Sequence, residues 1–138
     1  MKILVSKCLT GCPCRYDGKS CPSEKVNEFL VGHTVFAVCP EQDGGLSTPR
    51  SPAERVGDKI IAKSGVDVTN EYNLGAQKAL ELAKKEKVDL CLLKAKSPSC
   101  GTGKIYDGTF SGNLIDGNGV TSELLTRHGF KVITENDL

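Results

Sequence analysis

The chain has 138 residues, 38% of them hydrophobic and 25% charged, which suits one compact domain with its own apolar core. A formal net charge of +1 provides no overall basic field, so direct binding to DNA or to an anionic membrane surface is not expected. No apolar run approaches the ~20 residues of a membrane-spanning helix and no signal peptide is recognisable, so we expect a cytoplasmic protein with a single domain over residues 1–138.

Two strands and a short helix are predicted at the start of the chain. Lys2–Ser6 and Thr34–Val38 are rich in Ile, Leu, Val and other strand-forming residues. Between them, Ser23 is placed to cap a helix that extends to Val31, with Gly32 as its stop.

The middle of the chain contains a loop-rich stretch followed by a long helix and a strand. Residues 42–66 are rich in glycine and proline and leave room for a short strand at Lys59–Ala62. Thr69 is placed to cap a helix to about Lys87, because apolar residues recur after it at helical spacing. Val88–Leu93 is apolar throughout, as is typical of a strand with helices on both faces.

The last third of the chain predicts one more helix and strand. Thr121 is placed to cap the helix, Val120 and Leu125 have the spacing of a hydrophobic staple, and Gly129 ends it. Lys131–Thr134 predicts the final strand. The alternation of strands and helices predicts an α/β fold, a three-layer sandwich around a mainly parallel sheet.

Cysteine usage is the unusual feature of the composition. The seven cysteines are Cys8, Cys12, Cys14, Cys21, Cys39, Cys91 and Cys100. In a reducing compartment, clustered cysteines indicate metal binding or thiol chemistry before disulfides. Three predicted strands lead to cysteines at their carboxyl ends, where parallel α/β sheets bind ligands, so we expect Cys8, Cys39 and Cys100 to converge on one edge of the sheet.

The cysteine spacing favours an iron–sulfur cluster and leaves two alternatives open. Structural zinc usually takes two close cysteine pairs, and this chain has no Cys-x-x-Cys. Ligation by sulfur alone also suits iron–sulfur clusters. The alternatives are a zinc site and thiols that are reactive or simply buried. Cys91, in the middle of a predicted strand, is expected in the core.

Eight short strings resemble the thiouracil desulfidase family, which long carried only a label of unknown function. In chain order they are SKCL from Ser6, CRYDG from Cys14, CPE from Cys39, GGL from Gly44, PR from Pro49, DVT from Asp67, KSPSCG from Lys96 and IYDG from Ile105. The resemblance extends from about residue 3 to the C-terminus, with the strings in the family's order.

The resemblance implies a [4Fe–4S] cluster held by three cysteines, with one iron open to the sulfur of a small thiolated pyrimidine. That partner is 4-thiouracil, its nucleoside or its nucleotide, and the implied reaction is a hydrolytic, non-redox desulfuration that releases hydrosulfide. Cys8, Cys14 and Cys100 are the expected ligands, with Cys39 as the alternative. Cys12 lies outside the matching strings but forms a Cys-Pro-Cys run with Cys14, which bears on the choice of ligands.

Two polar residues are expected to carry the chemistry. Glu41 stands two residues after Cys39 and is the expected base that activates water, with its pKa raised by nearby thiolates and the cluster. Ser97 is the hydroxyl expected to position this water, and Ser99 is the alternative. A non-catalytic iron–sulfur or zinc protein would require neither Glu41 nor Ser97.

Two arginines complete the predicted site as substrate contacts. Arg15 and Arg50 are expected to lie near the crevice and to bind a substrate phosphate. The alternative for each is an ion pair, for example with Asp17 or Glu54.

Overall fold

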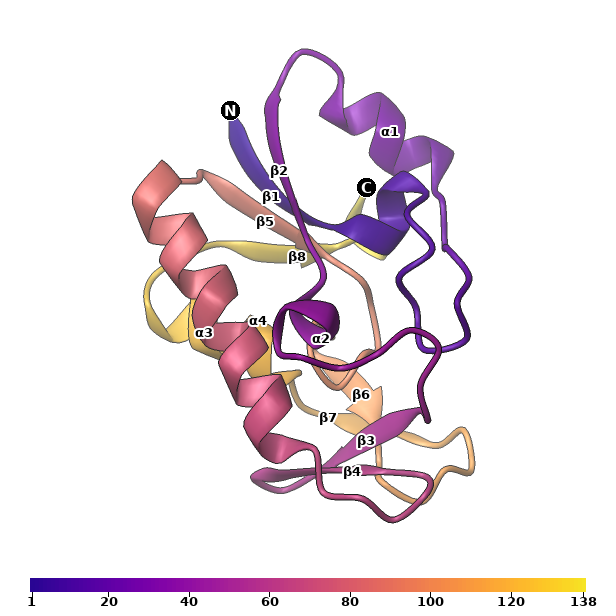
Figure 1. Ribbon diagram of the computed structural model, residues 1–138. Coiled ribbons are helices and arrows are strands. Elements are labelled where there is room, and N and C mark those ends of the chain that lie inside the picture. The colour runs from indigo at the N-terminus through magenta and orange to yellow at the C-terminus, as the bar shows by residue number, and fades with distance from the viewer.

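The computed structural model describes residues 1–138 and has a central sheet of four parallel strands in the order β2-β1-β5-β8 (Figure 1). These strands are β1 (Lys2–Ser6), β2 (Thr34–Val38), β5 (Leu90–Leu93) and β8 (Val132–Thr134). In the register of the sheet, Leu4 of β1 pairs with Phe36 on one side and with Cys91 on the other. The first strand is therefore interior to the sheet.

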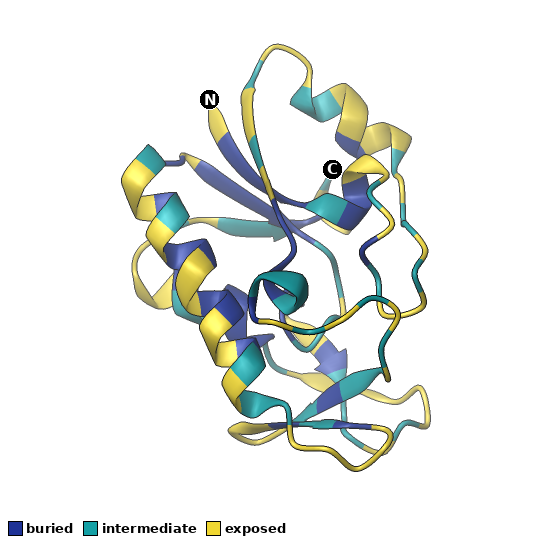
Figure 2. Cartoon of the chain, viewed as in Figure 1, coloured by how far each residue is buried: buried dark blue, intermediate teal, exposed yellow.

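Helices cover both faces of this sheet, so the predicted three-layer α/β sandwich is confirmed. The helices are α1 (Glu24–Leu30), α2 (Pro40–Asp43), α3 (Thr69–Glu86) and α4 (Val120–Arg127), with 3-10 helices at Lys7–Thr10 and Glu135–Asp137. Leu4 and Leu93 pack with residues of α3 and α4, whereas Val5 and Leu92 pack with Val26 of α1 on the opposite face. The side chains of β1 and β5 alternate between these two buried layers, and these two strands are mostly dark blue in Figure 2.

Two small antiparallel sheets lie beyond the carboxyl ends of the central strands, in the lower part of Figure 1. One pairs β3 (Ala53–Val56) with β4 (Lys59–Ala62), and the other pairs β6 (Lys104–Tyr106) with β7 (Leu114–Asp116). Only β4 is predicted from the sequence, because the other three strands are short and partly exposed and lack a clear alternation. None of the helices combines the length and apolarity needed to cross a membrane.

One of the three predicted helix caps is present and two are wrong. The Ser23 hydroxyl accepts a hydrogen bond from Val26 N at 3.3 Å and caps α1. The N-cap of α3 is Val68, because the hydroxyl of Thr69 accepts from Ile60 N at 2.9 Å instead. The hydroxyl of Thr69 thus connects the helix to β4.

The N-cap of α4 is Gly119, and the predicted cap residue Thr121 lies inside the helix. Thr121 is fully buried, and its Oγ1 lies 2.7 Å from the Oγ of Ser99. The predicted staple residues Val120 and Leu125 are both buried, and the chain leaves the helix at Gly129 with a positive φ of 88°. The hydroxyl of Thr121 therefore hydrogen-bonds to the loop that contains Cys100.

Candidate functional site

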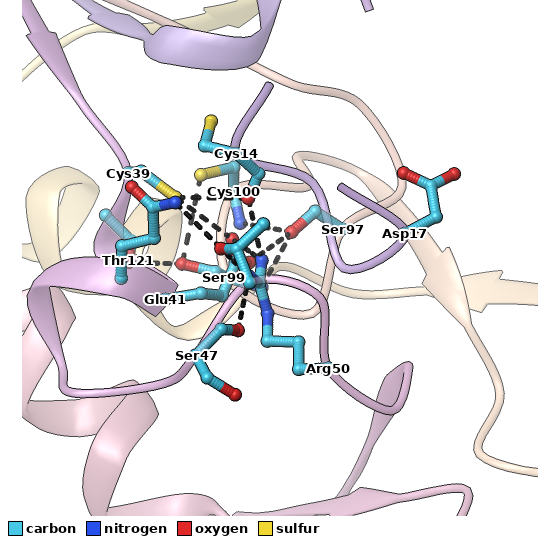
Figure 3. Close-up of polar contacts among 12 residues, drawn as sticks. Cys14, Asp17, Cys39, Glu41, Ser47, Arg50, Ser97, Ser99, Cys100 and Thr121 are labelled. Carbon is cyan, nitrogen blue, oxygen red and sulfur yellow. Dashed lines mark hydrogen bonds and ion pairs between the residues drawn. The ribbon is translucent and has the colours of Figure 1, made fainter. Parts of the chain in front are cut away.

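A cavity of about 520 Å3 lies beyond the carboxyl ends of β1, β2 and β5. Ser6 and Val38, the last residues of β1 and β2, contribute to its wall, as does Lys94, which directly follows β5. Four of the seven cysteines line this cavity, namely Cys8, Cys14, Cys39 and Cys100. The structure thus gathers at one sheet edge the cysteines that strand topology predicted to converge. Figure 3 shows the sulfur atoms of Cys14, Cys39 and Cys100 close together.

The thiols in this cavity interact with one another. Cys39 Sγ donates to Cys14 O at 3.7 Å, and the thiols of Cys39 and Cys8 lie near enough to Cys14 to shift its pKa. Cys39 lowers the pKa of Cys14, but Cys8 and burial outweigh it, so that the net shift is upward. Burial, with a smaller contribution from Glu41, raises the pKa of Cys100 to about 12. Without a bound cation the thiols of Cys14, Cys39 and Cys100 are protonated, and a metal centre would displace protons on binding.

The loop of residues 97–101, hereafter the Cys100 loop, is organised by the hydroxyl of Ser97. This oxygen accepts hydrogen bonds from the backbone N–H of Ser99 at 3.0 Å and of Cys100 at 3.1 Å. The same hydroxyl donates to Glu41 Oε1 at 3.4 Å. Ser97 therefore joins a cysteine and a carboxylate that are far apart in the sequence.

Glu41 is placed by α2, a four-residue helix that the sequence analysis missed. Its neighbour Pro40 packs so closely on α3 that a Cβ at Gly75 would lie 1.8 Å from Pro40 O. The Glu41 side chain is 16% exposed, and desolvation by burial raises the pKa of its carboxyl group. Arg50, Cys39 and Ser97 oppose this shift. Burial is the largest cause of this upward shift.

Arg50 joins the carboxylate to the loop that contains Cys14. Its Nη2 lies 3.3 Å from Glu41 Oε2 and donates to Cys14 O at 3.1 Å, and only 9% of the side chain is exposed. The ion-pair partner is thus Glu41 and neither Asp17 nor Glu54.

Glu54 has a different role in the wall of the cavity. One of its carboxylate oxygens accepts hydrogen bonds from the backbone N–H of Gly108 at 2.9 Å and of Phe110 at 3.2 Å. Arg15 forms the predicted alternative ion pair with Asp17, although at 3.8 Å and partly exposed. Asp17 lies apart from the thiols in Figure 3. Arg15 therefore remains available to a ligand in the cavity.

The remaining predicted residues divide between the cavity and its surroundings. Ser99, the alternative hydroxyl and substrate contact, is fully buried against Thr121 and is not among the lining residues. Its role is to hold the Cys100 loop against α4. Cys91 lies in the core as predicted, and Cys12 and Cys21 are half-buried and do not line the cavity.

Sequence reasoning missed several lining residues that come from other segments. Lys63 follows β4, Tyr72 lies in α3, and Phe110 lies in the turn between β6 and β7. No local pattern marks Lys63, Tyr72 or Phe110, because the small sheets and α3 bring them to the cavity only in the folded chain. Lys7, Lys94 and Lys96 are further lining cations, and Lys94 pairs with Glu135 at 2.9 Å. Lys7 and Lys96 belong to the SKCL and KSPSCG strings of the family resemblance.

The donor set fits an iron–sulfur centre. No group of three His, Cys, Asp or Glu side chains is arranged to hold a single metal ion. Four cysteine thiols instead border one cavity that also has room for a small molecule. Sulfur ligands of this kind are those that iron–sulfur clusters take.

Fold and site together define a parallel α/β domain with a cysteine-lined cavity at the carboxyl edge of its sheet. Residues 3–137 match the 2-thiouracil desulfurase family. The uncharacterized protein YbbK of Bacillus subtilis (strain 168) is 47% identical over 146 residues, which cover 99% of this chain and 97% of the relative.

A solved structure shows the same fold. The [4Fe-4S]-dependent thiouracil desulfidase TudS superposes with a TM-score of 0.93 at 47% identity, covering 99% of this chain and 92% of that chain. The chain therefore belongs to the 2-thiouracil desulfurase family, and the resemblance seen in its sequence is confirmed.

Proposed function

We propose that the protein is a [4Fe–4S] cluster-dependent desulfidase that converts a thiolated pyrimidine to its oxo form and releases hydrosulfide. Membership of the family and the cofactor named for TudS support this reading. The observation that carries it is the hydrogen bond between Ser97 and Glu41 in the wall of the cysteine-lined cavity, because a non-catalytic cluster protein would not require this pair.

Cys8, Cys14 and Cys100 are the proposed cluster ligands. Cys39 is left as the fourth, non-ligating thiol, because its Sγ has two protein acceptors, Cys14 O at 3.7 Å and the Glu41 carboxylate at 3.8 Å, whereas Cys100 Sγ has one, Ser99 Oγ at 3.8 Å. When bound, a cluster with three protein ligands supplies an open iron, a Lewis acid that accepts the sulfur of the substrate.

Glu41 and Ser97 are the proposed water-activating pair. The Glu41 carboxylate accepts a proton from water while the water oxygen bonds to the ring carbon, and Ser97 keeps the carboxylate oriented. The carbon–sulfur bond then breaks and sulfur leaves as hydrosulfide. One water molecule and one thiocarbonyl group give one carbonyl group, hydrosulfide and a proton, so that no external electrons are needed.

The charges of the cavity favour a substrate that carries a phosphate. Six cations and two carboxylates line the cavity, namely Lys7, Arg15, Arg50, Lys63, Lys94 and Lys96 against Glu41 and Glu54. Arg50 and Lys94 are occupied by Glu41 and Glu135. Arg15 and the remaining lysines are the proposed phosphate contacts, which makes 4-thiouridine monophosphate the expected better substrate than 4-thiouracil.

The test is an oxygen-free preparation of the protein, loaded with iron and sulfide and then assayed for both. Hydrosulfide release is measured with 4-thiouracil and with 4-thiouridine monophosphate. We expect release from both, with the higher kcat/KM for the nucleotide and a stronger effect of salt on it. A loaded protein that releases no hydrosulfide would instead be a cluster carrier.

A further inference from the structure

Tyr72 is a cavity residue with a buried ring and a hydroxyl without a partner. It lies near the start of α3 and is only 4% exposed. Its ring packs in an apolar cluster with Ile60, Ala76 and Val120. Tyrosine commonly combines such an apolar body with a polar end that needs a hydrogen-bond partner.

The hydroxyl of Tyr72 faces the cavity. No protein group hydrogen-bonds to it, although the residue lines the cavity. The only fully buried side-chain oxygen or nitrogen without a partner is Oε2 of Glu71, so the phenol oxygen keeps contact with the solvent space of the cavity. An unpaired phenol in this position is a free hydrogen-bond donor for a bound molecule.

The groups around this phenol are those of the proposed reaction. Burial raises the pKa of Tyr72 above its usual range, and the nearby Glu41 carboxylate adds to the shift, whereas Arg50 opposes it. Cys100 and Cys39 act on it as well. The phenol therefore stays protonated near neutral pH, so it keeps a proton to donate to a molecule in the cavity that Glu41 also lines.

We infer that Tyr72 is a further active-site residue that donates a hydrogen bond to the water which Glu41 deprotonates. This inference rests on the proposed function. The water has two protons and two lone pairs, so it can donate to Glu41, accept from Tyr72 and still present one lone pair to the ring carbon. Tyr72 thereby limits the orientations of the attacking oxygen.

The same geometry has a consequence for the product. The oxygen of the attacking water becomes the new carbonyl oxygen of the pyrimidine, so Tyr72 donates to this oxygen once the reaction is complete. The thiolated substrate has sulfur at that ring carbon and makes no such contact. Tyr72 should therefore matter for product binding and for kcat, and little for substrate binding.

Tyr72→Phe removes the hydroxyl and keeps the packed ring. We expect kcat for the thiolated substrate to fall about tenfold with KM unchanged, and the affinity for uridine monophosphate to fall about tenfold in calorimetry of the loaded protein. Thr126→Ala is the control, because it also removes a hydroxyl, but from an exposed residue of α4 that does not line the cavity. It should leave both quantities unchanged.

The outcomes separate this inference from the proposed function. Iron content and the urea midpoint of Tyr72→Phe are expected to equal those of the unmodified protein. A loss of iron would assign Tyr72 to cluster retention and overturn the inference, as would unchanged kcat and unchanged product affinity. If the unmodified loaded protein releases no hydrosulfide, the proposed function itself fails.

Discussion

The chain segments that supply Cys100 and Cys14, two of the three proposed ligands, are built in different ways. The Cys100 loop is bonded to α4, with Val120 N donating to Pro98 O at 2.9 Å and Thr121 N to Ser99 O at 2.8 Å. It also packs closely against Gly119, the N-cap of α4, because a Cβ at Gly119 would lie 2.3 Å from Ser99 C. This segment is fixed by backbone contacts on several sides.

The segment of residues 11–22, hereafter the Cys14 loop, is tied down by fewer groups. Its backbone bonds are mostly to itself or to the preceding 3-10 helix, as in Cys14 N to Cys12 O at 2.9 Å and Cys12 N to Lys7 O at 3.3 Å. Contact with the rest of the cavity comes mainly through Arg50, whose side chain donates to Cys14 O and whose N–H donates to Tyr16 O, and through Cys39 Sγ at 3.7 Å from Cys14 O.

The wall of the cavity formed by the Cys100 loop is therefore preformed, and the wall formed by the Cys14 loop is adjustable. Glu41 lies between them, since it accepts from Ser97 of the Cys100 loop and from Arg50, which holds the Cys14 loop. The rigid wall positions Cys100 and Ser97, whereas the adjustable wall lets Cys14 close around a centre as it is loaded.

The largest expected effect comes from removing the ligand on the rigid wall. Cys100→Ala should abolish hydrosulfide release and lower bound iron and sulfide to background, because no other thiol lies in that loop. The control is Cys21→Ala, a half-buried cysteine of the Cys14 loop that does not line the cavity. Retention of a full complement of iron by Cys100→Ala would contradict the ligand assignment.

The group between the two walls should give the next largest effect. Glu41→Gln keeps the shape of the side chain but cannot accept a proton, so kcat should fall about 10³-fold. Iron content should stay unchanged, because Glu41 is not a proposed ligand. Activity within tenfold of the unmodified protein would exclude Glu41 as the base.

A steric change tests how rigid the Cys100 loop is. Gly119→Ala forces a methyl group against backbone atoms of Ser99 and Cys100, and the free energy of unfolding should fall by about 2 kcal/mol in urea titrations. Bound iron should decrease as well. Gly32→Ala is a useful comparison, because Gly32 has open space around it but a positive φ of 81°, so its cost of about 1 kcal/mol is backbone strain alone.

The smallest expected effect comes from Arg50, which links Glu41 to the Cys14 loop. Arg50→Lys keeps the charge but loses the planar fork, in which Nη1 donates to Ser47 O and Thr48 Oγ1 while Nη2 donates to Cys14 O and Glu41, so the Cys14 loop should open more often. We expect the cluster absorbance to decay about fivefold faster in air. A fivefold change in rate corresponds to about 1 kcal/mol, the contribution of one lost hydrogen bond. Arg127→Lys, at an exposed ion pair on α4, should decay at the normal rate.

Much of the fold could be predicted because the apolar pattern of the chain is locally consistent. The bounds of β1, β2 and β4 agree with the predicted ranges, and α3 agrees to within one residue. The two wrong caps fail for one reason: the hydroxyls of Thr69 and Thr121 bond to segments distant in the sequence, which no local pattern reveals. Helix α2 is too short for its periodicity to be detected.

The sequence predicts those site residues that the order of strands brings together, but not those that reach the cavity only through packing of helices. Strand ends carry Cys8, Cys39 and Cys100 to one edge, so their convergence follows from the order of elements. Tyr72 instead appears in the sequence as one more apolar position of a helix. Only the packing of α3 against α2 shows that its hydroxyl reaches the cavity.

Because β1 pairs with β5, a bound cofactor should raise the thermal stability of the whole protein. Cys8 and Cys14 follow β1, Cys100 follows β5, and these two strands are direct neighbours in the sheet. A group bound to all three sulfurs bridges both strands, so heat denaturation must also release that group. The melting temperature of a preparation is then a gauge of its occupancy, readable before any substrate is added.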